Sequence, residues 1–277
     1  MQVTTLSEKA ERLRQLHQRG NPLVLFNVWD AVSARIVEEL GYPALATGSA
    51  AVAWTQGYPD GEHISRDGML AAVARIARVV TVPLSADLEG AYGRTAADAA
   101  ATARGAIEAG AAGLNFEDAG EPGHLLDLDL QCERIEAMVE MGKRLGVPLV
   151  INARTDVFLH GGEMESRVDE AIRRGNRFLR AGADCVFVLG VSDETAIARL
   201  AAQIQGPINV FATAKTPPVK RLAELGVARV SVGPSGLAHA LNYVRRAAQR
   251  LRDEGTFDFA ADRISGDELD ALFVPKR

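Results

Sequence analysis

A repeated alternation of short apolar runs with longer amphipathic segments constrains this chain more than any other feature. The segments between the runs have the spacing of helices, and strands that alternate with helices indicate parallel strand pairing. The predicted strands are LVLFNV (23–28), ALAT (44–47), VPLSADL (82–88), GLNFE (113–117), PLVINAR (148–154), CVFVLG (185–190), INVFAT (208–213) and RVSVG (229–233).

Several of the predicted helices end at a glycine, where left-handed φ carries no steric penalty. The helical segments include AVSARIVEEL (31–40), MLAAVARIARVV (69–80), AADAAATARGAIEAG (96–110) and ESRVDEAIRRGNRFLRAG (165–182). The glycines are Gly41, Gly110, Gly146, Gly182 and Gly226. Eight such strand-helix units favour a (β/α)8 TIM barrel, and an open doubly wound sheet remains the alternative.

We expect residues 1–277 to form one barrel domain, because α/β barrels of roughly 250 residues fold as single domains. A helix over about 6–20 precedes the first strand, and a helical extension covers about 236–277. The extension carries apolar side chains such as Phe257 and Phe273, which need a cover. That cover is either the chain's own barrel or a neighbouring subunit.

Composition excludes several classes of partner. The formal charge of −5 provides no basic surface for nucleic acid. No apolar run reaches the roughly 18 residues that a membrane span needs, and the N-terminal segment lacks a signal-peptide core. The two cysteines, Cys132 and Cys185, supply neither a disulfide framework nor a zinc site. These features predict a cytoplasmic protein with no membrane partner.

Carboxylates gather at two neighbouring strand ends, where barrel enzymes place their reacting groups. Asp87 and Glu89 are two residues apart, and so share a side if the strand is still extended there. Glu117 ends the next strand. Oxygen ligands without nearby His or Cys favour Mg²⁺ or Mn²⁺. Each acid alone could instead cap a helix or sit in a solvated loop.

Other polar residues at strand ends suit a small anion. Arg154 in NARTD offers a rigid fork for a carboxylate or phosphate, or for a salt bridge to one of the acids. Thr47, Gly48 and Ser49 in ATGSA could form an anion cradle from backbone N–H groups and hydroxyls. Asn209 in the seventh run completes the expected substrate-binding set.

Five segments together resemble the isocitrate lyase and phosphoenolpyruvate mutase superfamily over about 20–235. They are NVWDAVSARIVEELGYPALATGSA, GYPDGE, SADLEGAYG, NFEDAG and NARTDVFL, in this order and spacing. The resemblance implies a Mg²⁺-dependent barrel enzyme that makes or breaks a carbon-carbon or carbon-phosphorus bond beside a 2-oxo acid through an enolate-like intermediate. It also implies a last barrel helix exchanged between subunits, in a homodimer or homotetramer.

The resemblance also implies roles for single residues. Asp87 matches the direct metal ligand, and Glu89 and Glu117 match acids that hold metal-bound waters. Asp60 matches an acid near the metal waters or the substrate, and Arg154 matches the arginine that lies opposite the 2-oxo acid. Thr47 and Gly48 match the pair that holds its carboxylate, and Trp29 and Asp30 fall beside the substrate.

One loop departs from the lyase pattern. Isocitrate and methylisocitrate lyases carry Lys-[Lys/Arg]-Cys-Gly-His after the fourth strand, whereas 118–129 reads DAGEPGHLLDLD, without cysteine. His124 is then the candidate acid-base of this loop, since its ordinary pKa suits proton transfer near neutrality, although a solvated loop histidine is the alternative. The expected activity is cleavage of a small 2-oxo or 2-hydroxy di- or tricarboxylate such as oxaloacetate. Carbon-phosphorus chemistry on phosphoenolpyruvate or phosphonopyruvate and a non-catalytic, metal-dependent 2-oxo acid binder are the alternatives.

Overall fold

Nine parallel strand segments form the sheet at the centre of the protein, seen here in a computed structural model that describes residues 4–120 and 123–274. The strands are β1 (Leu23–Leu25), β2 (Asn27–Val28), β3 (Leu45–Thr47), β4 (Leu84–Asp87), β5 (Gly113–Glu117), β6 (Val150–Thr155), β7 (Cys185–Val188), β8 (Ile208–Phe211) and β9 (Arg229–Ser231). Their order in the sheet is β1-β9-β8-β7-β6-β5-β4-β3-β2.

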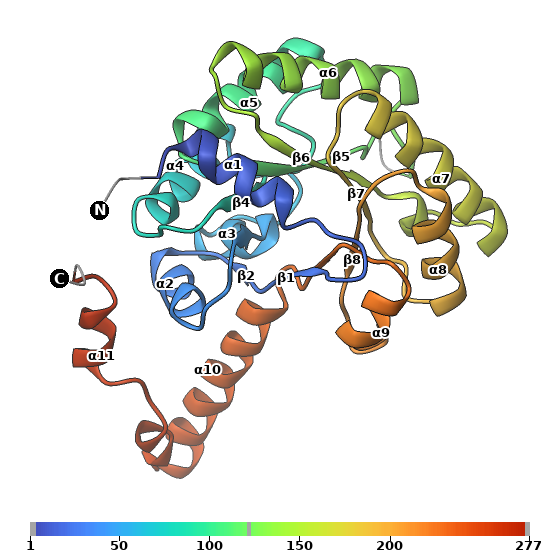
Figure 1. Ribbon diagram of the computed structural model, residues 1–277. Coiled ribbons are helices and arrows are strands. Elements are labelled where there is room, and N and C mark those ends of the chain that lie inside the picture. Colours follow the sequence, from blue (N-terminus) through green and yellow to red (C-terminus); the bar gives the residue numbers. More distant parts are fainter. Residues whose placement is uncertain (1–3, 121–122, 275–277) are drawn as a thin grey trace.

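The two ends of this sheet come from one apolar run. Within 23–28, β1 pairs with β9 and β2 pairs with β3, and the chain changes partner at Phe26. The sheet therefore curves into a nearly closed barrel, with helices around its outside (Figure 1). The predicted (β/α)8 barrel is confirmed.

The helices follow the strands as the sequence pattern predicts. They are α1 (Leu6–Gln15), α2 (Ala31–Glu39), α3 (Ser49–Thr55), α4 (Arg66–Ala77), α5 (Ala96–Glu108), α6 (Leu128–Arg144), α7 (Met164–Arg180), α8 (Glu194–Gln203), α9 (Val219–Glu224), α10 (Ser235–Glu254) and α11 (Gly266–Ala271), with 3-10 turns η1 (Val157–Leu159) and η2 (Asp258–Ala261). Gly41 and Gly182 end α2 and α7 with φ of 85° and 104°, as expected of glycine after a helix.

The first helix is shorter than predicted. It ends at Gln15 rather than near residue 20, because Gln18 and Asn21 form an antiparallel bridge around Gly20, whose φ is 78°. This turn leads the chain from α1 directly into β1. Among the described residues, no helix is both long and apolar enough to cross a bilayer.

A buried histidine and a buried arginine meet where α1 joins the barrel. The His17 Nδ1–H donates to the Leu13 carbonyl at 2.8 Å, and its Nε2 accepts from Arg229 at 3.3 Å, which requires a neutral ring. Arg229 on β9 also donates to Ser85 and to the Asn115 side chain inside the barrel. Burial and the neighbouring Arg229 lower the pKa of His17 to about 3.

Acid should therefore destabilise the fold through His17. Unfolded histidine binds a proton below its ordinary pKa of 6.5, whereas the folded ring does so only near 3. Between pH 6.5 and about 3 the unfolded state therefore binds more protons than the folded state. The free energy of unfolding is at its full value above pH 6.5 and decreases as the pH is lowered, by about 2 kcal/mol at pH 5. Urea unfolding at pH 7.5 and 5 should show a smaller loss for His17→Gln. The exposed His239→Gln serves as a control, and an equal loss in both variants would contradict the assignment.

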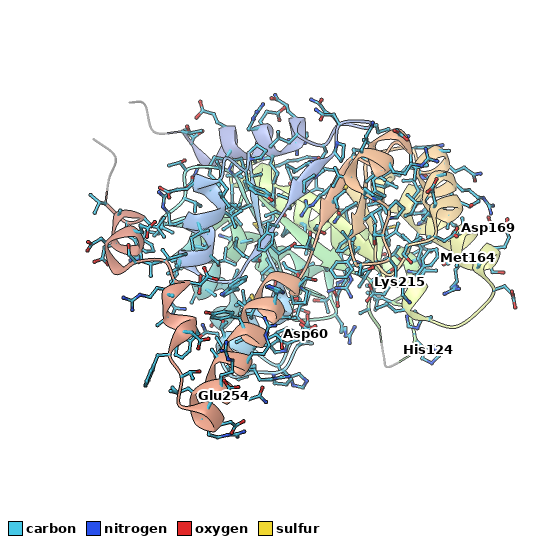
Figure 2. All side chains as sticks on the ribbon, turned by 90° about the horizontal axis from the view of Figure 1, so that it is seen from below. Asp60, His124, Met164, Asp169, Lys215 and Glu254 are labelled. Atoms are coloured by element: carbon cyan, nitrogen blue, oxygen red, sulfur yellow. The ribbon has the colours of Figure 1, made fainter. Side chains whose placement is uncertain are left out.

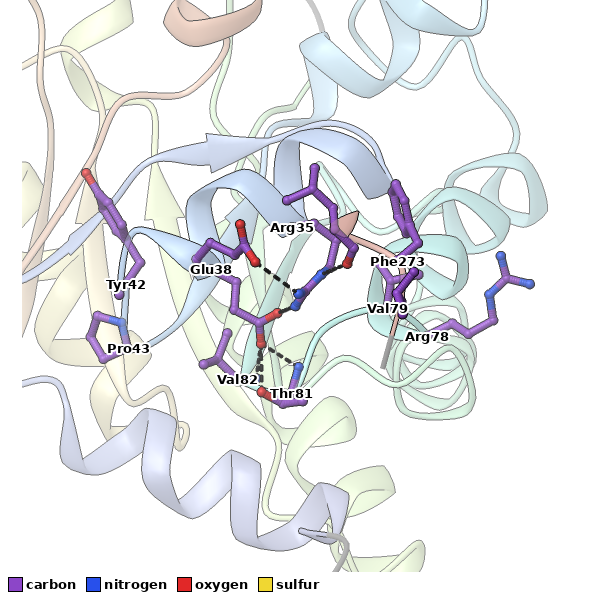
Figure 3. A pocket seen from close by; sticks show the side chains of 13 residues that line it. Arg35, Glu38, Tyr42, Pro43, Arg78, Val79, Thr81, Val82 and Phe273 are labelled. Atoms are coloured by element: carbon purple, nitrogen blue, oxygen red, sulfur yellow. Dashed lines mark hydrogen bonds and ion pairs between the residues drawn. The ribbon is translucent and has the colours of Figure 1, made fainter. Parts of the chain in front are cut away.

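The C-terminal extension projects from the barrel and then returns to it (Figure 1). Helix α10 is exposed along nearly its whole length, whereas Leu272 after α11 is buried against the barrel. The Arg35 Nε of α2 donates to the Leu272 carbonyl at 2.7 Å. A cavity of about 760 Å³ lies between this tail and α2, where Glu38 binds Arg35 and Thr81 (Figure 3). It opens beside residues that precede β3 and β4, away from the carboxyl ends of the strands.

Candidate active site

Asp87, the last residue of β4, lies in a group of acids at the carboxyl end of the barrel. The members of this acid group are Asp60, Asp87 and Glu89. The Asp87 backbone N–H donates to Thr47 Oγ1 at 2.8 Å, and its Oδ2 accepts from the Ser49 N–H at 2.9 Å. The Ser49 hydroxyl lies 3.5 Å from Asp60 Oδ1 in the next loop. Burial, then the charge of Asp87, raises the pKa of Asp60. The two carboxylates therefore share one electrostatic site.

The predicted anion cradle at Gly48 and Ser49 is already engaged inside the protein. The Gly48 N–H donates to the Val28 carbonyl at 3.3 Å, and the Ser49 N–H donates to Asp87. These donors fix β3 and the start of α3 to the neighbouring strands. In this arrangement Thr47 and Ser49 position Asp87, and the N–H groups of Gly48 and Ser49 both donate to partners within the protein.

Glu89 reaches the acid group through a turn, not through an extended strand as expected. Strand β4 ends at Asp87, and Glu89 has a left-handed φ of 51°. Its carboxylate accepts from the Glu62 N–H at 2.5 Å and from the Tyr92 hydroxyl at 3.4 Å. The side chain is buried, and burial together with Asp87 raises its pKa to about 7.

Arg154 on β6 binds two carboxylates at the same end of the barrel. Its Nη1 lies 2.5 Å from Glu117, its register partner on β5. Its Nε and Nη2 donate to the two oxygens of Asp156 at 2.6 and 2.8 Å. Burial raises the pKa of Glu117, and Arg154 opposes that effect. Burial lowers the pKa of Arg154, but Glu117 and Asp156 outweigh it and keep the guanidinium charged.

Three of the predicted substrate residues have other partners in the structure. Asp30 is exposed and caps α2 by accepting from the Ser33 N–H at 2.7 Å. Asn209 is buried and exchanges hydrogen bonds with Ser231 on β9. Trp29 lies beside Gly236, at the start of α10. The described contacts do not join these side chains to the acid group.

His124 lies on an exposed loop rather than among the acids. Its carbonyl accepts from the Gly120 N–H, and the residue borders surface hollows with Arg94 and His160. Figure 2 shows it at the edge of the molecule, while Asp60 lies near the centre of that view. An acid-base role would require this loop to move inward.

Several residues that support the site were not among the predicted set. Asp156 holds Arg154, and its position two residues after Arg154 was the only available signal. Glu62 locks the Asp60 loop onto the Glu89 turn, since its N–H binds Glu89 while its carboxylate accepts from the Tyr92 N–H at 2.6 Å.

Cys132 is buried on α6, and burial raises the pKa of its thiol, as for a structural cysteine.

The acid group fits a hard divalent cation held partly through water. Burial and then the charge of Asp87 raise the pKa of both Asp60 and Glu89, and a cation between these carboxylates would relieve the repulsion. In the part of the chain that the structure describes, no three His, Cys, Asp or Glu side chains are close enough to ligate one ion directly. A cation that keeps several water ligands, as Mg²⁺ does, suits this arrangement.

The known proteins to which this chain is similar belong to one group of related enzymes. The family model for phosphoenolpyruvate phosphomutase matches residues 13–252. The chain is 30% identical to 2-methylisocitrate lyase of Escherichia coli, covering 91% of this chain and 87% of that one. It is 33% identical to oxaloacetate decarboxylase of Ectopseudomonas mendocina, covering 86% and 83%. A solved oxaloacetate acetylhydrolase with bound oxalate superposes with a TM-score of 0.84 at 27% identity, covering 96% and 94%.

A parallel barrel with acids and a buried arginine at the carboxyl ends of its strands defines an α/β-barrel enzyme. The chain belongs to the phosphoenolpyruvate phosphomutase family, within the PEP mutase/isocitrate lyase superfamily. The resemblance inferred from NVWD, GYPDGE, SADLEG and NARTD is thereby confirmed.

Proposed function

We propose that the protein is a Mg²⁺-dependent lyase or hydrolase that cleaves a carbon-carbon bond in a small 2-oxo or 2-hydroxy di- or tricarboxylate, with oxaloacetate as the first candidate. The main support is the position of Arg154, whose guanidinium is kept charged by Glu117 and Asp156. Arg154 and Asp87 both lie at the carboxyl ends of their strands, on the same side of the barrel. An anion bound by Arg154 would lie beside the metal site. The relatives, which include oxaloacetate and methylisocitrate enzymes, support this substrate class.

Three acids would hold the cation. Asp87 would ligate it directly, and Glu89 and Glu117 would hold its waters. The bound metal would supply Lewis-acid stabilisation of the negative charge that develops on the 2-oxo group as the bond breaks. Mn²⁺ also prefers oxygen ligands, so it would substitute for Mg²⁺ at this site.

The remaining roles fall to the chain's own side chains. Arg154 binds a substrate carboxylate through its guanidinium, and Asp156 orients that group. Asp60, whose pKa is raised by burial and by Asp87, holds and moves a proton at its carboxyl oxygen. His124 remains a second proton carrier, provided that its loop closes.

A substrate panel tests the activity. Oxaloacetate, 2-methylisocitrate, 2,3-dimethylmalate and phosphonopyruvate are each supplied with Mg²⁺, and release of acetate, oxalate, pyruvate or phosphate is followed. We expect oxaloacetate to be cleaved, and EDTA to stop the reaction. Turnover of phosphonopyruvate alone would favour carbon-phosphorus chemistry. Saturable, Mg²⁺-dependent oxalate binding without any turnover would favour a binding protein.

We propose further that the enzyme is a cytoplasmic homodimer or homotetramer in which α10 packs on a partner subunit. Along α10, Leu237, Leu241, Val244 and Leu251 lie at helical spacing, and the last three are 49%, 58% and 40% exposed. A regular apolar stripe on a projecting helix is typical of an interface.

Charge on this stripe should dissociate the assembly. In analytical ultracentrifugation, Leu241→Glu/Val244→Glu should shift the protein from dimer or tetramer to monomer, because the introduced carboxylates would be buried without partners. The exposed Arg245→Glu on the same helix serves as a charge control. A monomeric wild type, or an unchanged oligomer in the double variant, would contradict the proposal.

A further inference from the structure

The turn that carries Glu89 is held in an unfavourable backbone conformation. Among the described residues, the non-glycine residues with positive φ are Glu62, Glu89, Ala91 and Tyr92, at 60°, 51°, 68° and 56°. All four lie in the two loops that border the acid group. Left-handed non-glycine residues cost of order 1 kcal/mol each and persist only where the surroundings enforce them. Some contact must therefore hold this turn.

Glu62 binds this turn from the neighbouring loop, and Arg134 of α6 binds it from inside the protein. Its side chain is fully buried, and its guanidinium donates to the carbonyls of Gly90 and Gly93, the latter at 2.7 Å. It also donates to Gln131 at 3.0 Å and lies 4.6 Å from the centre of the Phe116 ring. Its Nε is buried without a hydrogen-bond partner, and the acceptors of its other nitrogens among the described residues are uncharged. The charged guanidinium of Arg134 therefore binds two backbone carbonyls and one side-chain amide.

Gln131 extends the same contact to the neighbouring strand. Its side-chain amide donates to the Glu117 carbonyl at 3.1 Å, while its oxygen accepts from Arg134. One face of α6 therefore reaches the turn after β4 and the end of β5 together. These are the two places that carry the acids assigned to the metal.

We propose that Arg134 is a positioning residue for the metal site, which holds the Gly90–Gly93 turn so that the Glu89 carboxylate faces Asp87. The inference rests on the metal site of the proposed function. A methionine would fill a similar volume without a buried charge, but it would leave the Gly90 and Gly93 carbonyls without a donor. The turn would then relax out of its left-handed conformation and carry Glu89 with it.

Metal affinity tests this role without any turnover. Mn²⁺ is titrated into metal-free protein and followed by electron paramagnetic resonance, for wild type, Arg134→Lys and Arg134→Met. We expect Arg134→Met to bind Mn²⁺ roughly 10- to 100-fold more weakly, as for other residues that orient metal ligands. Arg134→Lys should fall between them, because an ammonium lacks the planar fork that reaches both carbonyls.

The controls separate positioning from general stability and from the proposed function. Arg144→Met removes an exposed arginine from the same helix and should leave Mn²⁺ affinity unchanged. If Arg134→Met does not fold, Arg134→Lys decides alone, with its circular dichroism and melting temperature checked first. Wild-type Mn²⁺ affinity in a folded Arg134 variant would overturn the inference. A wild type that binds Mn²⁺ but cleaves no substrate would refute the proposed activity and leave this inference standing.

Discussion

Replacing Asp87 by Asn should weaken Mn²⁺ or Mg²⁺ binding by at least about 100-fold and lower kcat/KM by about 1000-fold or more. The amide keeps an oxygen for the Ser49 N–H, which now donates to Asp87 at 2.9 Å, so the local structure should persist. What is lost is the negative charge that the cation needs. Calorimetric titration with Mg²⁺ and steady-state rates on oxaloacetate measure the two effects.

A matched control separates this effect from the loss of any surface carboxylate. Asp169→Asn removes an exposed acid on α7 that pairs with Arg199, and it should change neither Mg²⁺ affinity nor rate. Asp87→Ala should bind no metal and should also lose some stability, because the Ser49 N–H is left without an acceptor. Unaltered Mg²⁺ affinity in Asp87→Asn would remove the basis of the metal assignment.

The barrel was predictable because its strands are buried on both faces. Such strands carry nearly continuous apolar runs, as in CVFVLG, where all four residues of β7 are buried. Glycines such as Gly110 and Gly182 marked the ends of their helices, since each has a left-handed φ directly after a helix. The break at Phe26 was not predictable, because a change of pairing partner leaves no mark on an apolar run.

The acids were predictable as a group, whereas their supports were not. Asp87 and Glu117 end strands, and strand ends meet at one edge of a parallel barrel. Arg134 lies in a charged helical segment, where an arginine usually faces solvent, and its burial depends on carbonyls more than 40 residues away in the chain. Likewise, Asp30 resembled a site acid but caps a helix. The local sequence pattern indicates which end of the barrel carries the site. Tertiary contacts decide which side chains point into that site.

Replacing Arg154 by Lys should raise the Kd for oxalate in the presence of Mg²⁺ and lower kcat/KM on oxaloacetate, each by roughly 10- to 100-fold, as expected for loss of charge-assisted hydrogen bonds of about 1.5–3 kcal/mol. Arg154 contacts Glu117 with one nitrogen and Asp156 with two others. A lysine ammonium cannot bridge both acids and still meet a ligand. Stability should fall as well, by about 3 kcal/mol, because a buried carboxylate loses its partner.

Arg199 provides the matched comparison, since it also bridges two carboxylates, Glu165 and Asp169, but at the surface. Arg199→Lys should alter stability by less than about 1 kcal/mol and leave oxalate affinity unchanged. Urea unfolding and oxalate titration of both variants then separate two roles for Arg154. If Arg154→Lys lost stability but bound oxalate as tightly as wild type, Arg154 would serve only to neutralise Glu117 and Asp156. The anion site would then have to be sought elsewhere at the strand ends, because Arg154 is the observation on which the substrate class depends.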